Sequence, residues 1–241
     1  MNMGFLPALL SFGSIFTNIV RALPVTLLIT FSAFAAGTLF ACLFTVARVR
    51  NIKFLAGLSG GLISFLRGTP LLVQIFLSYY GLPAVMKLAG IDISGFNIIL
   101  FPVAAMALNC SAFLSEIMRS AYLGVNKGQI EAAYSVGMNS LQMFWRILFP
   151  QAFKIALPNL GNFIIDLLKD TSMVFSIGIV DIMGQARNLS AASYGIYQLQ
   201  SFLAVSLLYW IVCILLEKGV SIFEKSYGKG QKDIGSGNKA V

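Results

Sequence analysis

The sequence predicts an all-α membrane protein with five transmembrane helices, its N-terminus outside and its C-terminus in the cytoplasm. Of the 241 residues, 58% are apolar and only 11% are charged, and the mean hydropathy is +0.84. A soluble domain carries roughly 25% charged residues, so this chain cannot cover a folded core with a wetted surface. Disorder is excluded as well, because disordered segments combine low hydrophobicity with high charge.

Five apolar regions are long enough to cross a bilayer, which takes about 20 mostly apolar residues. The second of them is interrupted once, by Arg67, and the fourth contains three charged residues. The first, third and fifth are free of charge. The five regions lie at 22–47, 54–86, 93–115, 155–180 and 188–216.

The distribution of Lys and Arg sets the predicted orientation. With the N-terminus outside, the cytoplasmic segments hold twelve Lys and Arg residues and the outer segments hold three. Positive residues collect on the cytoplasmic side of membrane proteins. Residues 1–19 then form an N-terminal segment, and residues 221–241 form a Gly-rich, basic cytoplasmic tail. No positive residue precedes Arg21 and no small-residue cleavage site follows a short apolar core, so we expect the first span to remain as an anchor.

Composition and motifs argue against catalysis and metal binding in this chain. The sequence contains no His, which excludes His-based catalysis and His metal sites. The cysteines Cys42, Cys110 and Cys213 are isolated, so we interpret them as small apolar packing residues. Gly228 and Lys229 are followed by Gly230, which rules out a phosphate-binding loop there. We therefore predict no catalytic residue, no metal ligand and no cofactor in this chain.

A helix break is predicted inside the second apolar region. Pro70 cannot donate a backbone hydrogen bond and disfavours helix at Thr69. Broken helices at membrane depth commonly line transport sites. In one interpretation Gly68 and Thr69 offer backbone groups to a substrate, with Arg67 near a carboxylate. In the other, the kink improves packing and Arg67 reaches the membrane interface.

Polar residues of the third region are further candidates for a substrate pathway. Asn109 and Ser111 lie in the middle of this region and are polar without being charged. Glu116 stands three residues before Arg119, so a helix-end ion pair explains it as well as a substrate contact does.

The fourth region carries charges at membrane depth, where an ion costs about 2.5 to 3.5 kcal/mol on insertion scales. Asn162, Asp166, Lys169 and Asp170 fall close to one stripe of a helix. In one interpretation Asp166 and Lys169 neutralise each other at a spacing of three residues. In the other, Asn162 and Asp166 line the pathway and receive an ammonium group.

The segment 131–150, EAAYSVGMNSLQMFWRILFP, is too polar to span a membrane. Gly137 tolerates positive φ and Asn139 favours a cap, so we predict a short helix, a turn and a second helix leading to Pro150. Such an element can enter a groove on a partner or lie on lipid as an amphipathic helix. Six apolar residues are expected to line one face: Ala132, Ala133, Val136, Leu141, Phe144 and Leu148.

Four motifs resemble those of ABC importer permeases. Glu131-Ala132-Ala133, Gly137, Ile147 and Pro150 match the pattern of the EAA loop, with Phe149 where Leu is usual. The stretches RGTPLLVQ (67–74) and KDTS (169–172) resemble the polar amino-acid branch. So does the segment 115–120 together with Gly128 and Gln129. Ala22-Leu23-Pro24 departs from this branch, which often carries Gly there.

The resemblance covers residues of about 20 to 220 and implies the permease subunit of a type I ABC importer of the polar amino-acid family. In such a chain 20–220 is the transmembrane domain and about 124–150 is the cytoplasmic coupling loop. The loop residues implied to contact the ATPase are Glu131, Ala132, Ala133 and Gly137. The structural motif residues are Pro70, Gln74, Lys169, Asp170, Thr171 and Ser172.

The resemblance also implies partners and a location. A cytoplasmic ABC ATPase dimer would bind ATP and Mg²⁺, and a second permease subunit, identical or homologous, would complete the pathway. An extracytoplasmic binding protein would deliver a polar amino acid such as cystine, glutamine or arginine across the cytoplasmic membrane of a prokaryote by alternating access. The competing function, an ATP-independent secondary carrier or channel, is disfavoured because such chains often contain repeated halves and no repeat is evident here.

Overall fold

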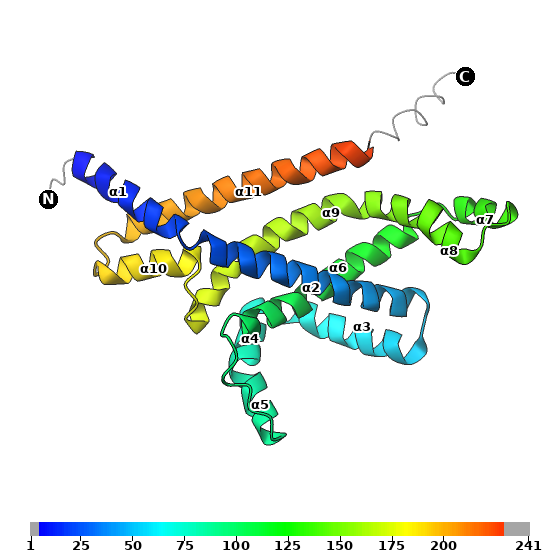
Figure 1. Cartoon of the computed structure of the whole chain (residues 1–241), viewed down its shortest axis with the longest axis horizontal. Helices are drawn as coiled ribbons and strands as arrows, with labels where there is room; N and C mark the ends of the chain where they lie inside the picture. Colours follow the sequence, from blue (N-terminus) through cyan, green and yellow to red (C-terminus); the bar gives the residue numbers. More distant parts are fainter. Residues whose placement is uncertain (1–4, 229–241) are drawn as a thin grey trace, which may run out of the picture.

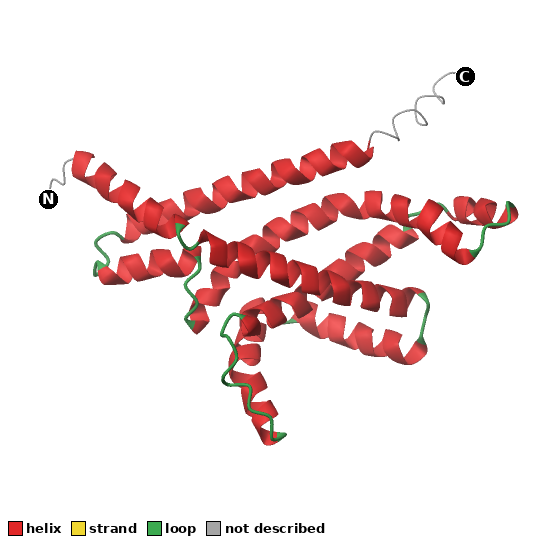
Figure 2. Ribbon diagram, viewed as in Figure 1, coloured by secondary structure: helices red, strands yellow, loops and turns green. Residues whose placement is uncertain are grey.

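The computed structural model describes residues 5–228, and it describes side chains from residue 12 to residue 227. Every regular element in this part of the chain is helical (Figure 2), which confirms the predicted all-α class. Residues 229–241 of the predicted tail lie outside the described residues. The α-helices are α1 (Phe5–Val20), α2 (Leu23–Val49), α3 (Lys53–Gly68), α4 (Leu71–Phe76), α5 (Leu82–Leu88), α6 (Leu100–Leu123), α7 (Lys127–Ser135), α8 (Ser140–Met143), α9 (Phe149–Asp170), α10 (Ile182–Ala192) and α11 (Gln198–Gly228). Two π-helical turns, η1 (Leu77–Gly81) and η2 (Phe144–Leu148), and one 3₁₀ helix, η3 (Thr171–Ile177), connect them.

The centre of the molecule is the pair α2 and α6, which pack against each other at close range. Ala33, Gly37 and Ala41 follow one another at four-residue spacing on α2 and are all buried. A Cβ atom on Gly37 would lie only 2.7 Å from the Cys110 Sγ atom of α6. Small residues at such spacing let two backbones approach, which is how helices associate in membranes.

A second core joins the N-terminal helix to the C-terminal part of the chain. Ile19 of α1 is buried with Leu168 of α9, Ile182 of α10 and Val205 of α11. The predicted N-terminal segment 1–19 is helical from residue 5 onward, and Phe12, Ile15 and Phe16 pack in this core together with Ile19.

Three segments that we predict to be cytoplasmic lie toward one end of the molecule. They are the α2–α3 turn, the α7–α8 segment and the end of α11, which all lie toward the right of Figure 1. Helices α1 and α10 lie at the opposite end, and the α4–α5 arm projects away from both. This arrangement is what three segments on one side of a membrane require, and the side that they face stays a prediction.

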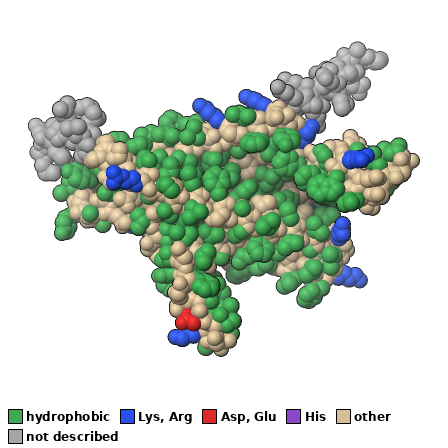
Figure 3. All heavy atoms as spheres, viewed as in Figure 1, with side chains coloured by type: hydrophobic (Ala, Val, Ile, Leu, Met, Phe, Trp, Pro, Cys, Tyr) green, Lys and Arg blue, Asp and Glu red, His purple; other side chains and the backbone are tan. Residues whose placement is uncertain are grey.

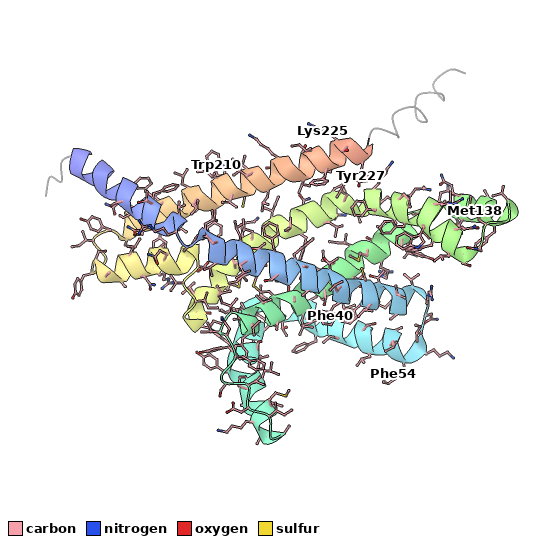
Figure 4. The ribbon with its side chains drawn as sticks, in the orientation of Figure 1. Phe40, Phe54, Met138, Trp210, Lys225 and Tyr227 are labelled. Atoms are coloured by element: carbon pink, nitrogen blue, oxygen red, sulfur yellow. The ribbon has the colours of Figure 1, made fainter. Side chains whose placement is uncertain are left out.

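Much of the outer surface is apolar. Hydrophobic side chains cover most of the face in Figure 3, and Lys and Arg lie mainly at its edges. Phe54 and Trp210 project outward from α3 and α11 (Figure 4), with 79% and 63% of their surfaces exposed. A soluble monomer rarely exposes an apolar surface of this extent. Contact with lipid would bury it.

Four segments are long and apolar enough to span a membrane: Phe12–Val49, Leu71–Leu88, Leu100–Leu123 and Gln198–Tyr227. The predicted region 54–86 is split after Gly68, and only its second half is part of a candidate span. Helix α9, which carries charged residues, is not a candidate span. The third span starts at Leu100 and not near residue 93, because a polar turn precedes it. In this turn the Asp92 carboxylate accepts hydrogen bonds from the hydroxyl and backbone N–H of Ser94, which lower the pKa of Asp92. Five spans therefore remain a prediction.

Candidate functional site

The predicted helix break is confirmed. Helix α3 ends at Gly68, Thr69 is extended with φ −115° and ψ 145°, and α4 begins after Pro70. The break leaves the last carbonyl groups of α3 without helical partners. In a lipid environment such groups must be satisfied inside the protein.

Two buried amides supply the missing hydrogen bonds. The Gln74 Nε2 group donates to the Leu66 carbonyl at 2.7 Å and to the Thr69 hydroxyl at 2.8 Å. The Asn109 Nδ2 group donates to the same carbonyl at 3.2 Å and to Gln74 Oε1 at 3.1 Å. Gln74, predicted as a structural motif residue, thus ties the broken helix to α6. Asn109, predicted for the pathway, is engaged in the same network.

An open groove of about 430 Å³ lies beside the break, between α2, α3 and α6. It brings together three of the predicted pathway residues, Arg67, Gly68 and Glu116. The guanidinium carbon of Arg67 lies 5.3 Å from the centre of the Phe113 ring, a cation–π distance. The groove therefore offers a positive group on an aromatic platform.

The carboxylate of Glu116 is held by two arginines at the end of the groove. Arg119 donates to it from Nη2 and Nε at 3.0 and 3.1 Å, and Arg48 of α2 forms an ion pair with its other oxygen. The helix-end pair with Arg119 was one of the two interpretations of Glu116. The part played by Arg48 was missed, because the sequence separates it from Glu116 by 68 positions.

The other predicted pathway residues do not line this groove. Asp166 forms an ion pair with Lys169 at 2.7 Å on the exposed side of α9, as the self-neutralising interpretation expects. Asn162 is exposed on the same helix. Ser111 is fully buried, and its hydroxyl donates to the Leu108 carbonyl at 2.6 Å.

The KDTS motif forms the corner after α9. Lys169 and Asp170 end the α-helix, and Thr171 and Ser172 begin the 3₁₀ helix η3. Thr171 is fully buried, and its hydroxyl donates to the Leu168 carbonyl at 2.7 Å. The motif thus shapes the backbone where the chain turns toward α10.

The segment from Asn126 to Pro150 folds into the predicted helix–turn–helix. Asn126 caps α7 by accepting from the Gly128 N–H group. Gly137 has φ +80° in the turn, a conformation that disfavours any residue with a Cβ. Asn139 and Gln142 form a reciprocal capping box at the start of α8. These hydrogen bonds fix where α7 and α8 begin, so the segment has a regular local structure of its own.

The expected apolar face of this segment is wrong in part. Ala133, Met143 and Leu148 are buried in a small core of their own. Val136 and Leu141 instead point outward, with 73% and 68% of their surfaces exposed. The turn changes the direction of α8 relative to α7, so the two helices do not share one continuous apolar face. Glu131 and Ala132 are also exposed.

The chain matches a known family over most of its length. The model of the family described as "Binding-protein-dependent transport system inner membrane component" matches residues 33–229. The L-cystine transport system permease protein TcyL of Bacillus subtilis is 39% identical over 92% of each chain. The probable amino-acid ABC transporter permease protein PatM of Vibrio harveyi is 41% identical over 71% of this chain and 74% of that one.

Solved structures have the same fold. A chain from the crystal structure of an amino acid ABC transporter with histidines has a TM-score of 0.78 and 31% identity, covering 94% of this chain and 100% of that chain. A chain of the inward-facing MetNI methionine ABC transporter has a TM-score of 0.65. At 18% identity the second likeness concerns the fold alone.

Proposed function

Because the chain belongs to the binding-protein-dependent transport inner membrane components, and within them to the amino-acid ABC transporter permeases, we propose that it carries a polar amino acid inward by ATP-driven alternating access. A separate ABC ATPase dimer binds ATP and Mg²⁺, and a second permease subunit completes the pathway. An extracytoplasmic binding protein delivers the substrate. The site of action is the cytoplasmic membrane of a prokaryote.

The observation that carries this proposal is the helix–turn–helix between Asn126 and Pro150. It stands at the end of the molecule toward which the predicted cytoplasmic segments lie (Figure 1), and it is joined directly to α6 and α9. Its internal core makes it stiff, while Glu131, Ala132 and Val136 face outward. A stiff element held in an ATPase groove can move the two helices attached to it between packed states.

The groove beside the helix break supports the substrate part of the proposal. Arg67 forms no ion pair with another described residue, so its guanidinium is free to suit a carboxylate, and Gly68 leaves the backbone accessible. Glu116 lines the same groove. Five other predicted pathway residues do not line the groove and are therefore weaker candidates: Thr69, Asn109, Ser111, Asn162 and Asp166. We take cystine or another amino acid as the substrate, because the relatives are named as cystine and amino-acid permeases.

The charge reversal Glu131→Lys tests the coupling role. We expect ATP-dependent uptake by the reconstituted transporter to fall about tenfold or more, because reversing a charge within a protein interface costs several kcal/mol. Binding of the amino acid to the separate binding protein should not change. Uptake of radiolabelled cystine and glutamine into vesicles, with ATPase activity measured in parallel, gives the readout.

Glu217→Lys provides the matched control, because Glu217 is an exposed acid on α11, outside the loop. Normal uptake in the Glu131 variant would contradict the coupling role. Uptake driven by an ion gradient without ATP would contradict the importer and support the secondary carrier.

A further inference from the structure

A row of aromatic rings runs from the end of the helix–turn–helix to the end of α11. Successive ring centres are 5.1 Å apart for Phe144 and Trp145, 5.2 Å for Trp145 and Phe149, 6.0 Å for Phe149 and Phe153, and 5.7 Å for Phe153 and Tyr227. We call these five residues the aromatic row. Tyr227 lies at the end of α11 near its last turn (Figure 4).

The aromatic row is exposed although it is apolar. Trp145, Tyr227 and Phe149 expose 57%, 50% and 42% of their surfaces. Within the described part of the chain, neither the Trp145 indole nor the Tyr227 hydroxyl has a recorded hydrogen bond. Tyr and Trp with an apolar body and an unsatisfied polar tip are enriched where a membrane meets water.

Three cations stand close to members of the row in the sequence, and none of them forms an ion pair with another described residue. Arg146 follows Trp145, Lys154 follows Phe153, and Lys225 precedes Tyr227 by two positions. The ion pairs among the described residues use Arg48, Arg119 and Lys169 instead. A positive group beside interfacial aromatic rings is complementary to a phosphate headgroup.

The surroundings of the row favour lipid over a water-bathed protein partner. Phe223 lies one helical turn before Tyr227 on α11, and Ile222 precedes it, with 61% and 68% of their surfaces exposed. Both residues belong to the segment Gln198–Tyr227, which is long and apolar enough to span a membrane, so the row lies at the end of a candidate span. The Lys residues are also unusual for the centre of a protein interface, where Lys is depleted.

We propose that the aromatic row with Arg146 and Lys154 is a binding site for the headgroup of an anionic phospholipid in the cytoplasmic leaflet. This inference rests on the orientation given under the proposed function. The rings anchor the junction of α9 and α11 at headgroup depth, and the two cations select phosphodiester headgroups that carry net negative charge.

The test compares lipid retention by the assembled transporter. The complex with its ATPase is placed in nanodiscs of phosphatidylcholine with phosphatidylglycerol, and native mass spectrometry measures the ratio of the two lipids retained after extraction. For the double variant Arg146→Gln/Lys154→Gln we expect this ratio to fall about 30-fold, and about fivefold for each single variant. The charge-conserving double variant Arg146→Lys/Lys154→Arg keeps both positive charges and should leave the ratio unchanged.

An unchanged ratio in the double variant would overturn the proposal. So would loss of the ATPase subunit from the double variant in phosphatidylcholine alone, which would show that the row is a protein interface. If the double variant does not assemble, the single variants give the same comparison. ATP-dependent uptake by the unaltered transporter in phosphatidylcholine vesicles tests the proposed function separately, because it does not depend on anionic lipid.

Discussion

Gln74 shows at the scale of one residue why a transmembrane helix can be broken and still be stable. The Thr69–Pro70 step interrupts the hydrogen-bond ladder, and the amide of Gln74 replaces the missing donor at the Leu66 carbonyl. Asn109 reaches the same carbonyl from α6, so one acceptor joins two helices. The price of the break is a buried polar network that must be complete, because a partly satisfied one is costly.

Replacing Gln74 by Ala should therefore destabilise the fold at the break. We expect the free energy of unfolding in detergent to fall by about 1–3 kcal/mol, the range for a buried polar group left without its partner. Thermal unfolding of the purified protein measures the change. Asn159→Ala is the matched control, because Asn159 is an exposed amide on α9 without a recorded hydrogen bond to the described residues. Equal effects of both variants would show that the network contributes nothing specific.

Residues differ in how far the sequence alone can place them. Pro70 acts on its immediate neighbours, so the break could be predicted from the local sequence. The pairing of Arg48 with Glu116 depends on how α2 packs on α6, and no local rule contains that information. For the same reason, sequence reasoning counted Arg48 only as a charge that sets the orientation.

Single elements follow from local signals, but their faces depend on what they pack against. Gly137 and Asn139 correctly located the turn between α7 and α8, since positive φ and capping are local properties. The apolar faces of these helices were predicted less well, because the turn changes the direction of α8 relative to α7. The close packing of α2 on α6 depends instead on small residues of α2, such as Gly37, and on the α6 residues that they contact.

Gly37 and Gly57 form a matched pair that tests this packing. Gly37→Ala places a Cβ atom 2.7 Å from Cys110 Sγ and 2.9 Å from the Ala107 carbonyl oxygen. We expect it to lower stability by about 1–3 kcal/mol, as overpacked cores do. Gly57→Ala meets no atom within 4 Å, and Ala is the better helix former, so stability should stay the same or rise slightly. Thermal unfolding of both variants gives the comparison, and a harmless Gly37→Ala would refute the tight α2–α6 contact.

At the scale of the whole molecule, the distribution of charged residues affects which helices are identified as membrane spans. Length and composition select four segments, and α9 is not one of them, since its mean hydropathy is lowered by charged residues such as Lys154 and Asp166 and by uncharged polar residues such as Asn159. Yet α9 connects the helix–turn–helix at one end of the molecule to α10 at the other (Figure 1). Pairing of Asp166 with Lys169 lowers the cost of placing these two charges in a membrane. The fold therefore supports a crossing that composition alone does not.

Cysteine labelling from the two sides of the membrane tests whether α9 crosses. Asn139→Cys lies in the turn of the helix–turn–helix, and Tyr194→Cys lies in the turn before α11, where the native side chain is 97% exposed. If α9 spans the bilayer with the predicted orientation, a membrane-impermeant maleimide should label residue 194 in right-side-out vesicles and residue 139 only in inside-out vesicles. The parent chain, with its own three cysteines, gives the background. Labelling of both positions from the same side would mean that α9 returns without crossing, and the helix–turn–helix and the α10–α11 turn could not then lie on opposite sides of the membrane.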